Sequence, residues 1–329
     1  MNRFSAIVST GSYVPEKVLT NFDLEKMVDT SDEWIRRRTG IIERRIADKS
    51  MASSDLGIQA SQKAIKDAGI DPLEIDLIIA ATITPDMVFP STSCFIQRGI
   101  GAKNAGAFDL SATCSGFCYG LAVADGLIKS GIHETVLVVA TDILSKITDW
   151  TDRTTCVLFG DAAGAAIIQP TSEEKGVLAS YLGADGNGAE IELLSLPGGG
   201  SRYPASHETV DKRMHYIRMN GQEVFKLGVR IMYESAKKVL SQAGLTIDDV
   251  DLFIPHQANI RIIEAVGERL RIPAEKTYVN IHKYGNTSAT TVIVALDEAI
   301  REGRVGCGDI VLFSTFGGGL TWGGTVIKL

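Results

Sequence analysis

The chain has 329 residues, of which 45% are hydrophobic and 22% are charged, and its net charge is −7 at pH 7. This profile is that of a soluble globular protein, with room for about two domains or one large duplicated domain. The acidic balance argues against a general nucleic-acid-binding protein, and no apolar run reaches membrane-spanning length. Five widely spaced cysteines without a secretory signal predict free thiols in a reducing, cytoplasmic compartment.

The first predicted element is a strand-like run over residues 1–11, and an arginine-rich segment follows it. That segment contains Arg36, Arg37, Arg38, Arg44 and Arg45. A second group lies in the other half of the chain and contains Arg261, Arg269 and Arg271. Two interpretations are open for both groups: solvated surface residues, which is the common case, or local anion-binding patches.

Two segments of the chain repeat one pattern. Ala64–Ala80 and Val239–Pro255 both read as a helix ending at Ala-Gly, a turn, and a buried strand after an aspartate, with an offset of 175 residues. A later helix ends at Gly131 in the first copy and at Gly303 in the second, with an offset of 172. We interpret this as an internal duplication, although matches this few also occur by chance.

Alternating strands and helices predict an α/β fold of layered sheets covered by helices. The duplication predicts two halves, residues 1–172 and residues 173–329. At the 172-residue offset Cys114 aligns with Asn286, and His256 follows a strand end in the second half. Because residues beyond strand ends and at helix starts face the crevice of such folds, we expect these three side chains to converge near a pseudo-twofold axis.

Cys114 precedes a helical pattern whose apolar face is Phe117, Leu121, Ala124 and Ile128. A thiol at a helix start meets unpaired N–H groups and the positive end of the helix dipole, which favours the nucleophilic thiolate. The alternative is a small buried core residue, since free cysteines are often buried. No ligand pattern for a metal joins the cysteines. We expect core packing for the other four, which are Cys94, Cys118, Cys156 and Cys307.

His256 leaves an apolar strand and precedes a helix, whereas the remaining histidines lack patterned neighbours and are expected to be structural: His133, His207, His215 and His282. The segment Tyr284–Ser288, with Asn286, opens the helix that corresponds to the one after Cys114, and its alternative role is a helix N-cap supplied by Asn286, Thr287 or Ser288. Three glycines, Gly317–Gly319, follow a strand. They can present free N–H groups as an oxyanion hole for acyl transfer, or they form a plain tight turn.

Together these motifs resemble the β-ketoacyl-acyl-carrier-protein synthase III family of thiolase-like condensing enzymes. The matching stretches span essentially the whole chain and are Ser31–Ile35, Arg38–Ile41, Ser111–Gly116, Phe159–Asp161, Pro255–Arg261, Tyr284–Ser288 and Phe316–Trp322. The resemblance implies a duplicated αβαβα layered fold with two mixed sheets around a buried helix pair. It also implies a catalytic triad of Cys114, His256 and Asn286, with an oxyanion hole formed by the N–H groups of Cys114 and Gly318.

The resemblance implies further contacts. The coenzyme A site maps onto Trp34, Arg38, Thr39, Arg153, Gly221, Phe225 and Asn259. Phe89 matches a residue that reaches the acyl pocket across a homodimer interface. Lys226, Arg261 and Arg269 match basic residues that dock an acidic carrier protein. Glu268 departs from the pattern, since family members can carry lysine there, and this places the strength of that docking patch in doubt.

The implied reaction is the decarboxylative condensation of an acyl-coenzyme A starter with malonyl-acyl-carrier-protein, through an acyl-Cys114 intermediate and without a cofactor or metal. Two alternatives remain: a related Cys-His-Asn starter enzyme of polyketide or alkylquinolone type, and a non-catalytic acyl-coenzyme A-binding scaffold. The starter group and the role of residues 194–213, expected to form a surface loop, are open at this stage.

Overall fold

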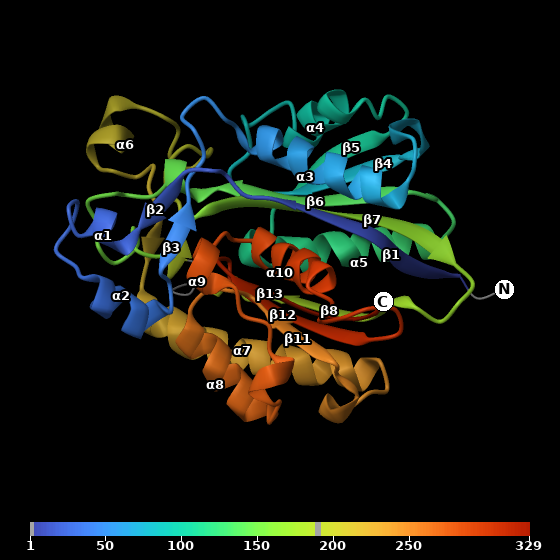
Figure 1. The fold of residues 1–329 in the computed structure, drawn as a ribbon. Helices are drawn as coiled ribbons and strands as arrows, with labels where there is room; N and C mark the ends of the chain where they lie inside the picture. The colour runs from blue at the N-terminus through green and yellow to red at the C-terminus, as the bar shows by residue number, and fades with distance from the viewer. Residues whose placement is uncertain (1–2, 188–191) are drawn as a thin grey trace.

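Two stacked β-sheets form the middle of the molecule (Figure 1). The computed structural model describes residues 3–187 and 192–329. The first sheet has the strand order β1 (Phe4–Tyr13), β7 (Asp161–Thr171), β6 (Val136–Ile143), β4 (Leu77–Ala81) and β5 (Gly106–Leu110). The second has the order β11 (Leu252–Pro255), β12 (Ile310–Gly317), β13 (Thr321–Lys328) and β8 (Gly176–Ala184). Both sheets mix parallel and antiparallel pairs.

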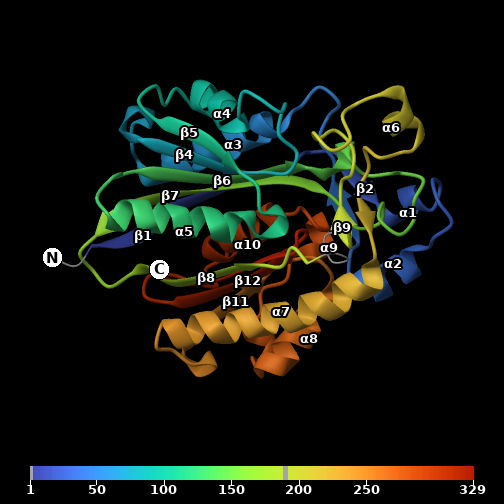
Figure 2. The ribbon, with the colours of Figure 1, turned by 180° about the vertical axis from the view of Figure 1, so that it is seen from behind.

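Helices form the other three layers. Between the sheets lie α5 (Gly116–Lys129) and α10 (Thr290–Arg301), which Figure 2 shows side by side. The outer face of the first sheet is covered by α3 (Ser53–Ala68) and α4 (Thr92–Ile100), and that of the second by α7 (Gly221–Gln242) and α8 (Ile260–Leu270). The expected layered fold, with two mixed sheets around a buried helix pair, is therefore confirmed.

The central helices are buried because each has apolar residues on more than one face. All four residues of the face expected for α5 are fully buried, and Phe117 meets Phe313 of β12 edge-on with ring centroids 6.4 Å apart. Gly164 of β7 lies against Ile293 of α10 so closely that a Cβ would approach the isoleucine methyl to 2.4 Å. Small residues thus let the helix pair pack closely on the sheets.

Equivalent positions of the two copies are built alike. β4 and β11 are the parallel neighbours of β6 and β12, and the aspartate before each strand receives a backbone N–H. Asp76 accepts from Glu134 N at 2.8 Å, and Asp251 accepts from Ile310 N at 2.8 Å. The strands of each sheet come from one side of residue 172. The division into halves at residues 172 and 173 stays a prediction.

The copies differ at one sheet edge. β4 pairs along its whole length with β5, whereas β11 makes a single parallel bridge, from Phe253 to Thr277, at the corresponding edge. In addition, α10 begins at Thr290, four residues after Asn286, and Ala289 rather than a polar side chain stands at its N-cap. The expectation that Asn286 opens or caps this helix is therefore wrong.

Smaller elements surround one end of the sheets. These are β2 (Val18–Thr20), α1 (Asn21–Leu24), α2 (Asp32–Thr39), β3 (Glu43–Arg45), β9 (Leu194–Ser195), α6 (His207–Asp211), β10 (Arg218–Met219) and α9 (Ile281–Tyr284). Residues 194–213 are mostly exposed, as expected, but they contain β9 and α6. Arg44 fits neither interpretation of the arginine cluster, because it is fully buried and donates to Leu19 O, Asn21 Oδ1 and Val157 O.

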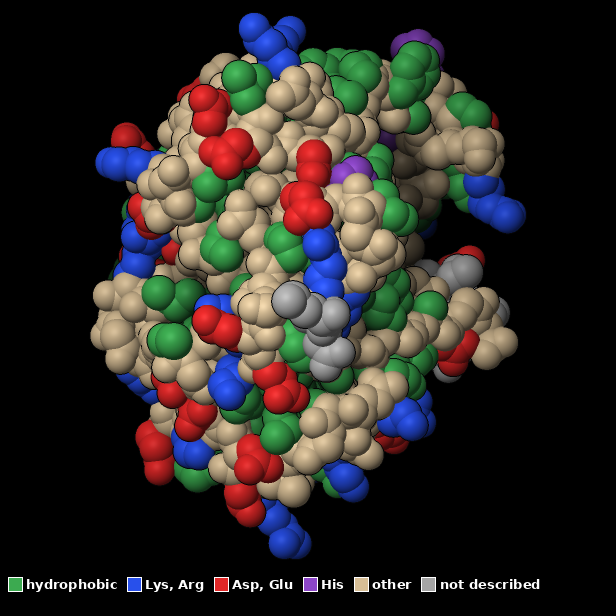
Figure 3. Space-filling view, turned by 90° about the vertical axis from the view of Figure 1, so that its right-hand side faces the viewer, with side chains coloured by type: hydrophobic (Ala, Val, Ile, Leu, Met, Phe, Trp, Pro, Cys, Tyr) green, Lys and Arg blue, Asp and Glu red, His purple; other side chains and the backbone are tan. Residues whose placement is uncertain are grey.

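Acidic and basic side chains lie interspersed on the face of the molecule shown in Figure 3. No helix within the described residues is long and apolar enough to cross a membrane. Cys118 and Cys156 are buried as expected, and Cys94 is half-buried. Cys307 is exposed in the turn before β12, so the expectation of core packing is wrong for this residue.

Candidate active site

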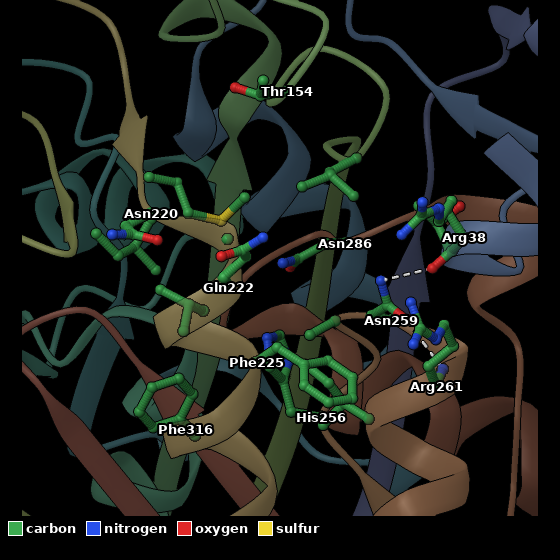
Figure 4. Close-up of a pocket in the computed structure, with 18 of the residues that line it drawn as sticks. Arg38, Thr154, Asn220, Gln222, Phe225, His256, Asn259, Arg261, Asn286 and Phe316 are labelled. Atoms are coloured by element: carbon green, nitrogen blue, oxygen red, sulfur yellow. Dashed lines mark hydrogen bonds between the residues drawn. The ribbon is translucent and has the colours of Figure 1, made fainter. Parts of the chain in front are cut away.

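A cavity of about 1200 Å³ opens beside the carboxyl ends of the central strands and brings together residues from both halves of the chain. Figure 4 shows His256 and Asn286 within it, with Arg38, Asn259 and Arg261 on one side. Cys114 lines the same cavity, so all three members of the expected triad face one space. The other predicted site residues along its wall are Trp34, Arg38, Thr39, Gly221, Phe225, Lys226, Asn259 and Arg261.

Cys114 lies in a 3-10 turn, Thr113–Ser115, that leads directly into α5. Thr113 has a φ of 47°, which is uncommon for a residue other than glycine. Its hydroxyl donates to Gly318 O at 2.9 Å and so fixes the turn against the glycine hairpin. The backbone of Gly317 approaches this turn so closely that a Cβ would lie 2.7 Å from Cys114 N.

The thiol is not the ready thiolate that its place before a helix predicted. Burial raises the pKa of Cys114 to about 12, an effect that outweighs the lowering by Ser288, and the nearby Asp142 raises it further. Desolvation disfavours the charged form of the thiol, and the helix terminus does not compensate for it. The cavity therefore holds Cys114 as a neutral thiol, which has to pass on its proton when it attacks.

His256 follows the last residue of β11, as the sequence predicted, and its side chain is 1% exposed. Its backbone N–H donates to Ser314 O at 2.9 Å, and its ring Nδ1 lies 2.7 Å from Thr291 Oγ1 on α10. Because Nδ1 is occupied by Thr291, Nε2 is the ring atom left to contact a ligand. Burial lowers the pKa of His256 to about 3, so the ring is neutral at pH 7.

Asn286 is held by a short β-bridge to Phe159 rather than by a helix. Its N–H donates to Leu158 O at 2.9 Å, and its carbonyl accepts from Gly160 N at 3.0 Å. The side-chain Oδ1 accepts from Ser288 N at 2.9 Å, which leaves the Nδ2 group as the donor that can face the cavity. The Phe159–Asp161 motif therefore acts as the backbone support of Asn286.

Gly318 belongs to the hairpin between β12 and β13, against the turn that carries Cys114. Its carbonyl oxygen accepts from Thr113 and Thr321, and a Cβ on it would lie 2.6 Å from Leu194 O. The hairpin therefore needs glycine because other chain segments approach it closely on two sides. Its role as an oxyanion donor stays a prediction.

Trp34 and Arg153 lie together at the cavity mouth, with the guanidinium 5.1 Å from the indole centroid. Arg153 also donates to Asp29 O at 2.8 Å and does not itself line the cavity. Arg38 approaches the same indole at 5.9 Å. Thr39, the last residue of α2, is buried and donates to Ile35 O at 2.7 Å. Aromatic and cationic groups thus gather where a nucleotide can stack and pair its phosphates.

Asn259 joins two parts of the cavity wall. Its side chain donates to Arg38 O at 3.0 Å and accepts from Arg261 N at 2.9 Å, so it caps α8 and holds the end of α2 beside it (Figure 4). Arg261 lies over the ring of Phe225 at 5.4 Å, and Lys226 pairs with Glu223 at 2.8 Å. The wall therefore ends in a basic rim.

Two predicted residues lie elsewhere. Phe89 is 82% exposed and lies outside the cavity wall of its own chain, so its expected role across a homodimer interface stays a prediction. Arg269 is exposed further along α8, in a second hollow with Arg271 and Lys237. The three basic residues expected to dock a carrier protein thus form no single cluster at the cavity mouth.

The sequence did not point to several residues of the site. Thr291 lies in the first turn of α10, and Asp142 lies near the end of buried β6. Ser288 ends the Tyr284–Ser288 motif, but the sequence suggested at most a helix cap for it. Apolar wall residues were missed as well: Val157, Leu158, Leu194, Met219, Met232 and Ile262. The polar residues sit within apolar or small-residue runs, where only the fold reveals a shared site. Within residues 3–187 and 192–329, no group of three or more His, Cys, Asp or Glu residues could hold a metal ion.

Comparison with known proteins identifies the family to which the chain is similar. Residues 108–186 match the family model described as 3-oxoacyl-[acyl-carrier-protein] synthase III, and residues 240–329 match that of its C-terminal part. Beta-ketoacyl-[acyl-carrier-protein] synthase III of Caldanaerobacter subterraneus is 57% identical over 98% of this chain and 97% of its own. The corresponding protein of Clostridioides difficile is 52% identical over 100% and 99%.

A solved structure extends the likeness to three dimensions. The 3-oxoacyl-[acyl-carrier-protein] synthase III of Aquifex aeolicus superposes with a TM-score of 0.91 and 49% identity, covering 99% of this chain and all of its own. The segments with Cys114, His256 and Asn286 lie within the residues that the two family models match. With identity above half over nearly the full length, the chain belongs to the β-ketoacyl-acyl-carrier-protein synthase III family of condensing acyltransferases.

Proposed function

We propose that this chain catalyses the decarboxylative condensation of an acyl-coenzyme A starter with malonyl-acyl-carrier-protein, giving β-ketoacyl-acyl-carrier-protein, coenzyme A and CO2. The observation that carries the proposal is the convergence of Cys114, His256 and Asn286 in one cavity. A thiol, a neutral imidazole and a primary amide supply one nucleophile and two hydrogen-bond donors. This is the minimal set for forming an acyl-enzyme and stabilising an enolate.

In the first stage, Cys114 Sγ attacks the thioester carbonyl of the starter, and the C–S bond to coenzyme A breaks. The N–H groups of Cys114 and Gly318 are the proposed donors to the tetrahedral oxyanion. The coenzyme A nucleotide stacks between Trp34 and Arg153, Arg38 and Thr39 lie beside it, and the pantetheine arm follows Gly221, Phe225 and Asn259. Arg153 and Trp34 lie together at this place, but at 5.1 Å the guanidinium already contacts the indole, so the two groups have to move apart before a base can enter between them.

In the second stage, malonyl thioester occupies the emptied cavity and loses CO2. The electron pair of the broken C–C bond enters the thioester as an enolate, whose oxygen accepts from His256 Nε2 and Asn286 Nδ2. The enolate carbon then attacks the acyl-Cys carbonyl, and the Cys114 thiolate leaves. Two contacts support these roles, because Thr291 occupies His256 Nδ1 and Ser288 N occupies Asn286 Oδ1, so each donor faces the cavity.

The proposed partners follow from the same surfaces. An acyl carrier protein is the malonyl donor, and the basic rim of Lys226 and Arg261, with Arg269 further along α8, suits an acidic carrier. Phe89 is proposed to complete the acyl pocket of a second copy in a homodimer, which agrees with its 82% exposure in the single chain. The reaction as written balances without a redox cofactor or a metal, and we propose the cytoplasm as its compartment.

Two substitutions separate the stages. Incubation with a panel of acyl-coenzyme A thioesters, followed by intact-protein mass spectrometry, is expected to show one added acyl group on the wild type and none on Cys114→Ala. Asn286→Ala is expected to acylate normally but to decarboxylate malonyl thioester about 100-fold or more slowly, the usual cost of removing one oxyanion donor. Normal decarboxylation by Asn286→Ala would show that the enolate role is wrong.

The same materials address the two alternatives. A starter enzyme of polyketide or alkylquinolone type would use malonyl-coenzyme A as readily as the malonyl-carrier form, so the two rates are compared side by side. A non-catalytic scaffold would bind acyl-coenzyme A without any covalent change at Cys114. The added mass in the first experiment also identifies the starter group.

A further inference from the structure

Asp142 is a fully buried carboxyl group that the proposed reaction does not use. It lies near the end of β6, and its side chain has 0% exposure. One carboxyl oxygen, Oδ1, accepts from Ile83 N at 2.9 Å and from the hydroxyls of Thr82 and Thr84, each at 3.0 Å. The other, Oδ2, has no hydrogen-bond partner among the described residues. A carboxyl oxygen so enclosed costs free energy unless a partner reaches it.

Ser288 supplies the facing group. It is fully buried, its φ is 60°, and its Oγ also lacks a partner at ordinary hydrogen-bond geometry within the described part of the chain. The packing of the neighbouring backbone places this hydroxyl in the region of both groups. Gly116, two residues after Cys114, lies so close to Ala81 and Ala289 that a Cβ on it would lie 3.0 and 3.3 Å from their Cβ atoms, and Thr82, next to Ala81, donates to Asp142. Burial raises the pKa of both Asp142 and Cys114, and the Ser288 hydroxyl offsets part of that rise in each. Rotation of one hydroxyl can therefore complete a chain from Sγ through Oγ to Oδ2.

We propose that Ser288 relays the proton of Cys114 to Asp142, which stores it while the acyl group is on the enzyme. This inference rests on the proposed function, because it supplies the proton acceptor that the first stage needs. His256 is poorly suited to accept the thiol proton. Its ring is buried, Nδ1 is occupied by Thr291, and Nε2 carries the ring proton in the tautomer that the second stage needs. The carboxyl is buried too, but it has one oxygen free to receive a proton.

The transfer balances in both directions. As Sγ forms its bond to the starter carbonyl, the thiol proton passes to Ser288 Oγ, and the Ser288 proton passes to Asp142 Oδ2. The coenzyme A thiolate leaves and takes a proton from solvent. After condensation, the C–S bond of the acyl-enzyme breaks, Cys114 leaves as a thiolate, and the two protons move back. The pair carries one negative charge, on Asp142, before the reaction and none once the acyl-enzyme has formed, so the buried site never holds a second anion and avoids its desolvation cost.

Few charged groups neighbour the relay of Cys114, Ser288 and Asp142 among the described residues. Asp161 is buried nearby and feels the charge of Asp142, but Ser145 and the N–H of Ala47 occupy its carboxyl oxygens. Cys114 is the other titratable group that responds to Asp142. Cys114 and Asp142 therefore titrate as a pair that shares one proton between its two apparent pKa values.

The first experiment counts protons during acylation. Wild-type protein is mixed at pH 7 with acyl-coenzyme A in weakly buffered indicator dye, and the acyl-enzyme is quantified by intact-protein mass spectrometry. Retention of the thiol proton on Asp142 predicts uptake of about one proton per acyl group, because the released coenzyme A thiol is protonated at this pH. Asp142→Asn and Ser288→Ala are expected to take up about none, since their thiol proton is released to solvent. Zero uptake by the wild type, or equal uptake by all three proteins, would overturn the relay.

Ser145→Ala is the matched control, because it removes a buried hydroxyl from the other carboxyl, Asp161, and is expected to keep the wild-type uptake. A second measurement does not need the enzymatic reaction: peptide mass spectrometry follows alkylation of Cys114 by iodoacetamide. The wild-type rate is expected to be flat between the two apparent pKa values, whereas Ser288→Ala rises about tenfold per pH unit. If the alkylation rates of wild type and Ser288→Ala rise equally steeply with pH, the relay is contradicted. If no acyl-coenzyme A modifies Cys114 in the first experiment, the proposed function is contradicted instead.

Discussion

Thr291 holds the ring of His256 through its 2.7 Å contact with Nδ1. When the threonine hydroxyl donates, the ring proton must lie on Nε2, the atom that faces the cavity. A tautomer with the proton on Nδ1 would offer the enolate a lone pair instead of a donor. The chemistry proposed for His256 therefore depends on a neighbour that does not itself line the cavity.

Thr291→Val tests this dependence, because valine keeps the shape of threonine and removes the hydroxyl. We expect acylation of Cys114 to stay near the wild-type rate and decarboxylation of malonyl thioester to fall about 10- to 100-fold, less than the loss of a whole donor. Thr290→Val is the control, since within the described residues the Thr290 hydroxyl bonds to Thr287 and not to His256. Equal losses in both stages for Thr291→Val would indicate a structural defect rather than a lost tautomer.

Burial of neutral His256 has a consequence for stability. The pKa is about 3 in the folded chain and near 6.5 when the ring is exposed, so between these values the unfolded chain binds the extra proton. The free energy of unfolding is therefore complete above pH 6.5 and falls by up to about 1.4 kcal/mol per unit as the pH drops from 6.5 toward 3.

Urea unfolding between pH 7.5 and 4 measures this slope. His256→Gln removes the titrating ring, so the difference between wild type and variant isolates it from the other groups, such as Asp142 and Asp161, whose pKa values are raised. The wild type should lose more stability than the variant as the pH falls. Parallel curves would mean that the ring accepts a proton without unfolding.

At the scale of elements, the packing of α10 on β7 depends on the missing side chain of Gly164. Alanine there would meet Ile293 at 2.4 Å, and both elements are buried. We expect Gly164→Ala to lower the free energy of unfolding by about 1–3 kcal/mol through overpacking. Gly126→Ala on exposed α5 surface meets nothing within 4 Å and should raise it by up to about 1 kcal/mol. Urea denaturation compares the two, and equal effects would contradict the packing argument.

The repeat in the sequence predicted the elements well where it was strong. The helix–turn–strand segments that contain Asp76 and Asp251 are built alike, and the layered fold follows from them. The prediction was wrong beside Asn286, because the 172-residue offset matched its position but not the local backbone. There Ser288 takes a positive φ and delays the start of α10, which no residue pattern indicated.

The site residues also divide into those that the sequence identified and those that it did not. Cys114 and His256 were identifiable because each stands where a strand or helix meets the crevice. The raised pKa of Cys114 and the burial of Arg44 were not identifiable, since both depend on what distant segments place around these side chains. The resemblance added the residues that we propose bind coenzyme A, and most of them line the same cavity. Asp142 has no neighbour in the sequence that marks it, because its partners come from two other segments.

The molecule as a whole is negatively charged, whereas the basic rim of the cavity is positively charged. The chain carries −7 overall, so the acidic carrier protein that we propose as partner would be repelled at long range and attracted by Lys226 and Arg261 only at short range. On the face shown in Figure 3 the two signs are interspersed, which offers no competing basic field there.

Arg261→Glu is therefore expected to lower kcat/KM for malonyl-acyl-carrier-protein about tenfold. The difference in kcat/KM between wild type and variant should become smaller as the salt concentration rises. Lys103→Glu makes the same change of net charge on exposed surface beyond α4, in the layer opposite α8, and should have little effect. Steady-state rates at several ionic strengths provide the measurement. A loss shared equally by both variants would assign the effect to net charge instead of to the rim.

The pairing of β1 with β7 bears on how the chain is made. Phe4 pairs with Thr171, and β1 is the edge of the first sheet, so its only partner strand in that sheet appears much later in synthesis. During synthesis, β1 with its apolar residues therefore stays unpaired for most of the time that the first half of the chain takes to leave the ribosome. Until β7 has been synthesised, the unpaired strand can pair with strands of other molecules. A chaperone that binds β1 during this time would prevent such pairing.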